Sequence, residues 1–136
     1  VRVVADCAPN PYSAQVLRTA LETWFPGRHW VLVFGASADK DIAGMLRALR
    51  PIVDYLIVTR SQHPRAAAPI ELADIAASVG KGAEVAVNVR RATQRALVAL
   101  EPGLGLLFTG SVFLVAEARE VWAEHNGHPV PENDKH

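Results

Sequence analysis

The chain has 136 residues, and 14 Lys and Arg residues balance 14 Asp and Glu residues, so its formal charge is +0 with histidines neutral. Half of the residues are hydrophobic, which at this length suffices for one well-buried core. The balanced charge does not favour nucleic acid or an anionic membrane surface, and no apolar run reaches the roughly 18 residues of a membrane span. The single cysteine, Cys7, excludes an internal disulfide and a cysteine zinc site, and it fits a cytoplasmic location. Because the first residue is Val rather than Met, we expect a piece of a longer protein.

Five short apolar runs rich in β-branched residues alternate with amphipathic stretches. The runs are nearly continuous rather than alternately apolar and polar, which is typical of strands buried on both faces. They predict strands at residues 1–5, 30–34, 55–59, 84–87 and 104–109.

Apolar residues three and four positions apart predict a helix after each strand. These stripes cover residues 16–24, 42–49, 70–76, 92–100 and 113–121. The strict strand–helix order predicts an α/β fold over residues 1–124, a three-layer αβα Rossmann-like domain with a mostly parallel sheet of about five or six strands. Residues 125–136 are polar, proline-bearing and aperiodic, and we predict that they form a mobile tail.

The segments that follow the strands are the candidate sites, because open parallel sheets bind ligands at the carboxyl ends of their strands. Asp6 and Asn10 follow the first predicted strand. Both residue types suit turns and helix caps, and a strand-end carboxylate also suits the hydroxyl groups of a ribose. This segment alone leaves both interpretations open.

Lys40 precedes the second predicted helix, between Asp39 and Asp41, either of which can cap that helix. A cation at a helix N-terminus opposes the helix dipole by about 0.3–1 kcal/mol unless an anion is also there. Lys40 is therefore either solvated or holds a carboxylate or phosphate against the first-turn N–H groups, and we favour the second interpretation.

Ser111 lies in a Gly-Ser turn between the last strand and the last helix. Such a turn exposes backbone N–H groups and a hydroxyl to an anion, and Ser111 serves as an N-cap in either case. The strand-end rule brings Lys40, Ser111 and Asp6 to one edge of the domain, which predicts a pocket for a ligand with carboxylate or phosphate groups. The loop after the third strand contains two arginines, including Arg65, which are ordinary for a solvated loop. It also contains His63, which we expect to be an exposed loop residue rather than a catalytic base.

The sequence holds no phosphate-binding loop, no dinucleotide fingerprint, no nucleophile triad and no histidine pair with metal-ligand spacing. We therefore expect no complete catalytic site and no metal site in this chain.

Four segments together resemble one family, the folylpolyglutamate and dihydrofolate synthases of the Mur ligase superfamily. Residues 6–11 (DCAPNP) are similar to its D-G-A-H-N-P segment, and residues 33–41 to its strand-G-x-x-x-D-K-D loop. Residues 59–66 resemble its loop ending in P-R-A, and residues 109–119 its T-G-S-L-(Y/F)-L-V-G-E-x-R segment. The motifs occur in the family's order over nearly the whole of residues 1–124.

The resemblance implies the C-terminal domain of a ligase, with a predominantly parallel sheet that includes one antiparallel strand. In that family, ATP phosphorylates a folate or dihydropteroate carboxylate, and the amine of L-glutamate then attacks the acyl phosphate. ATP, magnesium and the folate are held mainly by an N-terminal domain that this chain lacks. The resemblance therefore implies that this chain alone is inactive.

The resemblance also implies roles for single residues. Asp6 would contact the ribose, and Asn10 would shape the loop near the nucleotide. Lys40 and Ser111 would bind the carboxylates of the incoming glutamate, with Arg65 in support.

Pro9 departs from the family pattern, because it replaces a histidine that lies near the phosphates. Proline has no side-chain donor and does not titrate, so the protein is either an impaired synthase or one in which another group, such as His63, takes that role. Two other functions stay open. One is a degenerate, non-catalytic binding module, and the other is a receiver-like signalling domain with Asp6 as phosphoacceptor, although receivers carry their lysine after the last strand.

Overall fold

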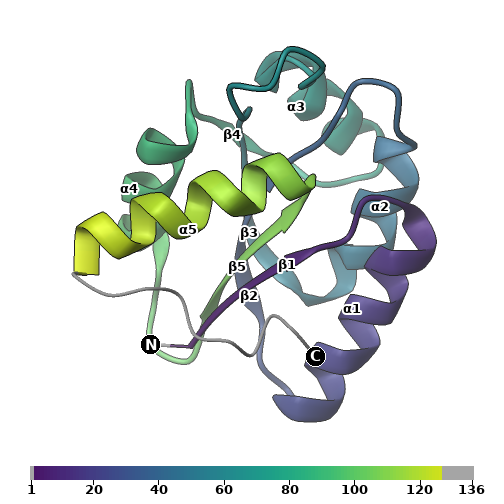
Figure 1. The fold of residues 1–136 in the computed structure, drawn as a ribbon. Coiled ribbons are helices and arrows are strands. Elements are labelled where there is room, and N and C mark those ends of the chain that lie inside the picture. Colours follow the sequence, from purple (N-terminus) through teal and green to yellow (C-terminus); the bar gives the residue numbers. More distant parts are fainter. Residues whose placement is uncertain (1, 127–136) are drawn as a thin grey trace.

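The computed structural model describes residues 2–126, and Figure 1 shows their fold. Strands and helices alternate along the chain, as the hydrophobic periodicity predicts. The strands are β1 (Val3–Cys7), β2 (Trp30–Gly35), β3 (Val53–Val58), β4 (Glu84–Val85) and β5 (Gly105–Gly110). The helices are α1 (Pro11–Trp24), α2 (Ile42–Leu49), α3 (Pro69–Ser78), α4 (Val89–Ala99) and α5 (Val112–Asn126), with a short 3₁₀ helix η1 (Arg50–Ile52).

The five strands form one sheet in the order β1-β5-β2-β3-β4, and every strand pairing among the described residues is parallel. The predicted α/β fold with a mostly parallel sheet is therefore confirmed. The antiparallel strand that the resemblance implied is not found within residues 2–126, where the one antiparallel contact is an isolated bridge between Ser37 and Ala66.

Two helical layers cover the sheet (Figure 1). On one face, α1, α2 and α3 pack against residues such as Leu32 and Phe34. On the other face, α4 and α5 pack against alternate residues of the same strands, such as Val31 and Val33. Successive side chains of a strand point to opposite faces, so each strand must be apolar throughout. This explains the continuous apolar runs in the sequence.

The boundaries differ from the prediction by up to five residues, as at the start of α1 and the end of α5, whereas α2 matches its predicted range. β1 covers residues 3–7 rather than 1–5, and Val1 lies outside the described residues. β4 pairs over only two residues. The N–H of Ala86 still donates to the carbonyl of Val58, and the chain then turns away and leaves Val87 71% exposed. α5 continues to Asn126, two residues into the predicted tail, and the rest of that tail lies outside the described residues.

The connections diverge around β5, which lies between β1 and β2. α5 follows β5 on one face of the sheet, whereas α1 and α2 follow β1 and β2 on the other. Open α/β sheets form their ligand crevices at such a divergence, at the carboxyl ends of the strands. Receiver domains place β1 between β2 and β3, so the edge position of β1 shows that the receiver-like prediction is wrong.

No helix among residues 2–126 is both long and apolar enough to cross a bilayer.

Candidate functional site

Two glycines let the carboxyl ends of β2 and β5 approach closely. Gly110 has a φ of +122°, and a Cβ there would lie 1.9 Å from the carbonyl oxygen of Gly35. A Cβ at Gly35 would in turn lie 2.7 Å from a methyl group of Leu114. With both side chains absent, the N–H of Ser111 donates to the carbonyl of Gly35 at 2.9 Å. This contact fixes the start of α5 against the end of β2.

The loops beyond these glycines enclose a hollow of about 310 Å³. Lys40 comes from the loop after β2, Arg65 from the loop after β3, and Ser111 from the start of α5. The structure therefore brings Lys40 and Ser111 together, as the strand-end rule predicted, and places beside them Arg65, which the resemblance alone assigned to the same ligand. The complete lining is Cys7, Pro9, Ser37, Asp39, Lys40, His63, Arg65, Ser111, Val112 and Phe113.

Backbone hydrogen bonds tie the loop that carries Lys40 to the loop that carries Arg65. The N–H of Ala38 donates to the carbonyl of Arg65, and the N–H of Ala67 donates to the carbonyl of Ala36, both at 2.9 Å. The two cationic side chains thus extend from a pair of loops that hold each other in place.

Ser111 is the N-cap of α5, because its hydroxyl accepts the N–H of Leu114 at 3.0 Å. The N–H groups of Val112 and Phe113 lie in the first turn, where a helix offers no carbonyl to accept them. These residues line the hollow, so its wall includes the positive end of a helix of 15 residues.

The charges around the hollow favour an anion. Lys40 and Arg65 oppose a single carboxylate, Asp39, and all three side chains are exposed. Asp41 takes no part, since its side chain caps α2 by accepting the N–H of Gly44 at 2.9 Å. Lys40 is therefore the residue of this loop that can bind an anionic ligand.

His63 is partly buried in the wall of the hollow, whereas the sequence predicted an exposed loop residue. Its ring stacks on that of Phe113, with the ring centroids 3.9 Å apart and an angle of 20° between the planes. This contact joins residues fifty positions apart in the chain, and no local sequence pattern indicates it.

Asp6 and Asn10 lie at the same edge of the sheet but do not line this hollow. Asp6 lines an adjacent hollow of about 280 Å³ along α1, together with Tyr12 and Trp24, and Cys7 borders both hollows. The Asn10 side chain is the N-cap of α1 and accepts the N–H of Ser13 at 2.8 Å. The sequence predicted one pocket for Lys40, Ser111 and Asp6, whereas the structure has two neighbouring hollows, one with Lys40 and Ser111 and one with Asp6.

Cys7 is an exposed thiol between the two hollows. Partial burial raises its pKa, and the neighbouring charge of Asp6 raises it further. Both effects disfavour the thiolate, which is the nucleophilic form of cysteine.

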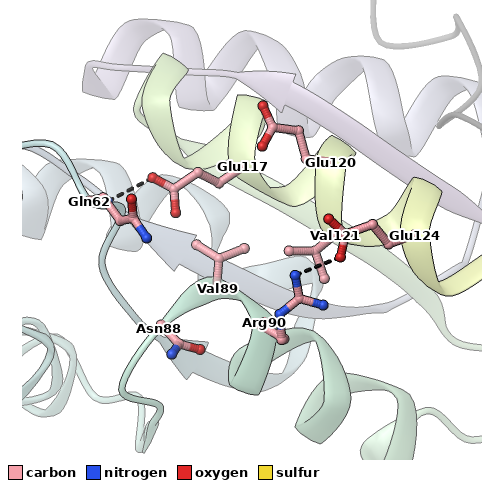
Figure 2. Close-up of a pocket in the computed structure, with 8 residues that line it drawn as sticks. All are labelled: Gln62, Asn88, Val89, Arg90, Glu117, Glu120, Val121 and Glu124. Carbon is pink, nitrogen blue, oxygen red and sulfur yellow. Dashed lines mark hydrogen bonds and ion pairs between the residues drawn. The ribbon is translucent and has the colours of Figure 1, made fainter.

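A third hollow, of about 190 Å³, lies between α4 and α5 (Figure 2). Its walls carry Glu117, Glu120 and Glu124, and Arg90 pairs with Glu124 at 2.6 Å. The Glu117 carboxylate accepts the N–H of Gln62 at 2.7 Å. This acidic groove does not suit an anion, and Lys40 does not line it.

Within residues 2–126, no three His, Cys, Asp or Glu side chains are grouped so that they could hold a metal ion.

A family model described as the glutamate ligase domain of Mur ligases matches residues 1–112. The chain is 32% identical to a dihydrofolate synthase/folylpolyglutamate synthase of Mycobacterium tuberculosis, covering 88% of this chain and 28% of that protein. It is similar to a solved Mycobacterium tuberculosis folylpolyglutamate synthase complexed with ADP, with a TM-score of 0.83 at 32% identity over 88% of this chain and 29% of that one.

A third similar protein is a bifunctional folylpolyglutamate synthase/dihydrofolate synthase from Yersinia pestis, solved with AMPPNP and a Mn ion. The TM-score is 0.74 at 27% identity, over 88% of this chain and 28% of that one. The chain therefore spans less than a third of the length of each of these relatives.

Proposed function

The chain belongs to the Mur ligase glutamate ligase domain family, as its four motifs predicted, and on that premise we propose that it supplies the L-glutamate site of an ATP-dependent folate ligase. In this proposal residues 1–124 form the C-terminal domain of a longer enzyme. That enzyme joins L-glutamate to a folate or dihydropteroate carboxylate through an acyl phosphate. A cytoplasmic location is part of the proposal and rests on the single free thiol.

The hollow beside Ser111 is the proposed glutamate site. Lys40 and Arg65 bind the two carboxylates, and the first-turn N–H groups of α5 donate to one of them. Holding both carboxylates orients the amino group, which must have lost its ammonium proton to solvent when it attacks the acyl phosphate. The role of this chain is therefore to bind and orient the amino acid.

In this proposal, ATP and magnesium bind mainly to another domain of the longer enzyme rather than to this chain. Asp6, in the adjacent hollow, contacts the ribose, and Asn10 shapes the loop beside it by capping α1. Magnesium is assigned to another domain, as the family resemblance implies. ATP supplies the phosphoryl group that activates the carboxylate, and the folate also binds largely to that other domain.

The observation that carries the proposal is the convergence of Lys40, Arg65 and Ser111 on one hollow from three separate loops. Calorimetric titration of the chain tests it. L-glutamate should bind, and L-glutamine, which lacks the side-chain carboxylate, should bind more weakly. The chain alone should turn over no ATP when folate and L-glutamate are present. Equal binding of the two amino acids, or turnover by the chain alone, would contradict the proposal.

A further inference from the structure

His63 makes three contacts that fix the geometry of the loop after β3. Its Nδ1 accepts the backbone N–H of Arg65 at 3.2 Å, and its own N–H donates to the Ser61 hydroxyl at 3.3 Å. Its ring stacks on Phe113 at the start of α5. A side chain that accepts the N–H two residues later closes a turn, so the imidazole determines the local path of the chain into Arg65.

The backbone of Arg65 is therefore held at both of its polar groups. Its N–H donates to the His63 ring, and its carbonyl accepts the N–H of Ala38 from the loop that carries Lys40. These contacts link His63 through Arg65 to the loop of the second cation. The loss of the His63 acceptor would release one end of this linkage.

α5 holds the same loop at a second point. The N–H of Gln62 donates to the Glu117 carboxylate, as Figure 2 shows, one residue before His63 stacks on Phe113. The loop is thereby joined to the helix whose N-terminus lines the hollow. The position of this loop relative to Ser111 is therefore set by side-chain contacts as well as by the backbone.

From these contacts we infer that His63 is a positioning residue for the anionic ligand of the hollow: its unprotonated Nδ1 and its stacked ring set where Arg65 lies relative to Ser111. The inference rests on the proposed function for the identity of the ligand, L-glutamate. His63 itself transfers no proton. It acts through Arg65 and through the wall formed with Phe113.

The inference predicts a specific state of the ring. With Nδ1 accepting a hydrogen bond, the neutral imidazole must carry its proton on Nε2. Nitrogen-15 spectra of the histidine side chains at alkaline pH should show an unprotonated Nδ1 for His63. A ring protonated at Nδ1 would contradict the inference without any ligand being present.

Two variants test whether the hydrogen-bond acceptor of residue 63, rather than only the size of its side chain, positions Arg65. Asparagine also accepts the N–H two residues later but has no ring to stack on Phe113, so His63→Asn should raise the Kd for L-glutamate by about twofold, less than His63→Ala does. His63→Ala removes the acceptor and should raise the Kd by about fivefold, as expected for the loss of one hydrogen bond. His29→Ala is the matched control, since His29 precedes β2 and pairs with Asp54 at the opposite end of the strands. It should leave the Kd unchanged.

Hydrogen exchange at the Arg65 amide distinguishes failure of this inference from failure of the proposed function. The exchange should be about tenfold faster in His63→Ala than in the wild-type chain or in His63→Asn. If the wild-type chain does not bind L-glutamate, the proposed function fails, and the exchange rates alone decide the role of His63. Unchanged exchange in His63→Ala, or an unchanged Kd where the wild type binds, would overturn the inference.

Discussion

Lys40 is the residue on which the proposed anion site depends most. It is the one cation in its loop, and neither of the neighbouring carboxylates, Asp39 and Asp41, can bind an anion. Asp41 is occupied as the cap of α2, and Asp39 has the wrong charge for an anion. Lys40→Ala should raise the Kd for L-glutamate at least tenfold, since it removes a charge-assisted contact. Arg47→Ala, which removes an exposed cation from the last turn of α2, should change the Kd less than twofold. Equal effects of the two substitutions in calorimetry would contradict a specific role for Lys40.

Cys7 offers a second test at this scale. Because burial and the charge of Asp6 both raise its pKa, the thiol should react with iodoacetamide at pH 8 more slowly than free cysteine does. Asp6→Asn removes one of the two causes and should accelerate the alkylation. Mass spectrometry over a time course measures both rates, and a slower reaction of Asp6→Asn would contradict the electrostatic explanation.

Single residues also show how much of the site the sequence could predict. Lys40 and Ser111 were predictable as neighbours, because strand ends in a parallel sheet converge, whereas Arg65 was assigned to the site only by the family resemblance. The stacking of His63 on Phe113 was not, since it depends on how two loops pack in space. The same limitation explains why Asp6 was predicted in the same pocket, although it lines the adjacent hollow.

Among the elements, β2 and β5 require glycine where they end. Gly110→Ala should lower the free energy of unfolding by at least about 2 kcal/mol, because the positive φ and the carbonyl of Gly35 both exclude a Cβ. Gly82→Ala is the control, since no atom lies within 4 Å of a Cβ built there. Urea denaturation measures both variants, and equal stability would contradict the close approach of the strands.

The short strand β4 is attached by a cluster of side chains. The Glu84 carboxylate accepts hydrogen bonds from Arg95 of α4, at 2.6 Å, and from Tyr55 of β3. The hydrogen bond from Arg95 and, to a lesser extent, the one from Tyr55 lower the pKa of Glu84 below its ordinary value of 4.5. A carboxylate with a lowered pKa contributes stability at neutral pH that is lost as the pH falls through its pKa in the folded protein.

Glu84→Gln should therefore flatten the decrease in stability of the chain below about pH 4.5. Thermal denaturation of the variant and the wild type between pH 3 and pH 7 measures the difference. Parallel curves over that range would show that Glu84 does not contribute to the pH dependence.

The type and order of the elements were predictable, because buried strands and amphipathic helices have different periods. The residues at which the strands and helices begin and end were less predictable. Asp54 interrupts the apolar pattern, so the start of β3 at Val53 was missed. Conversely, Ala86 and Val87 continue the apolar pattern of β4, although only Ala86 makes a backbone hydrogen bond to β3 and neither belongs to the strand.

At the scale of the whole molecule, our proposal makes the two hollows on either side of Cys7 the wall that the chain contributes to a larger active site. Sheet order places both at the carboxyl edge, where the helices after β1, β5 and β2 diverge. This edge was predictable from the alternation of strands and helices. The order of the strands was not, because β5 returns between β1 and β2 only through long-range packing of α4 and α5.

The most direct test of this account is to map where L-glutamate binds on the chain by proton–nitrogen NMR. The account predicts that the perturbed amides cluster around the first hollow, at residues 37–40, 63–65 and 111–113. Perturbations confined to the acidic groove between α4 and α5, or to the hollow beside Asp6, would contradict it.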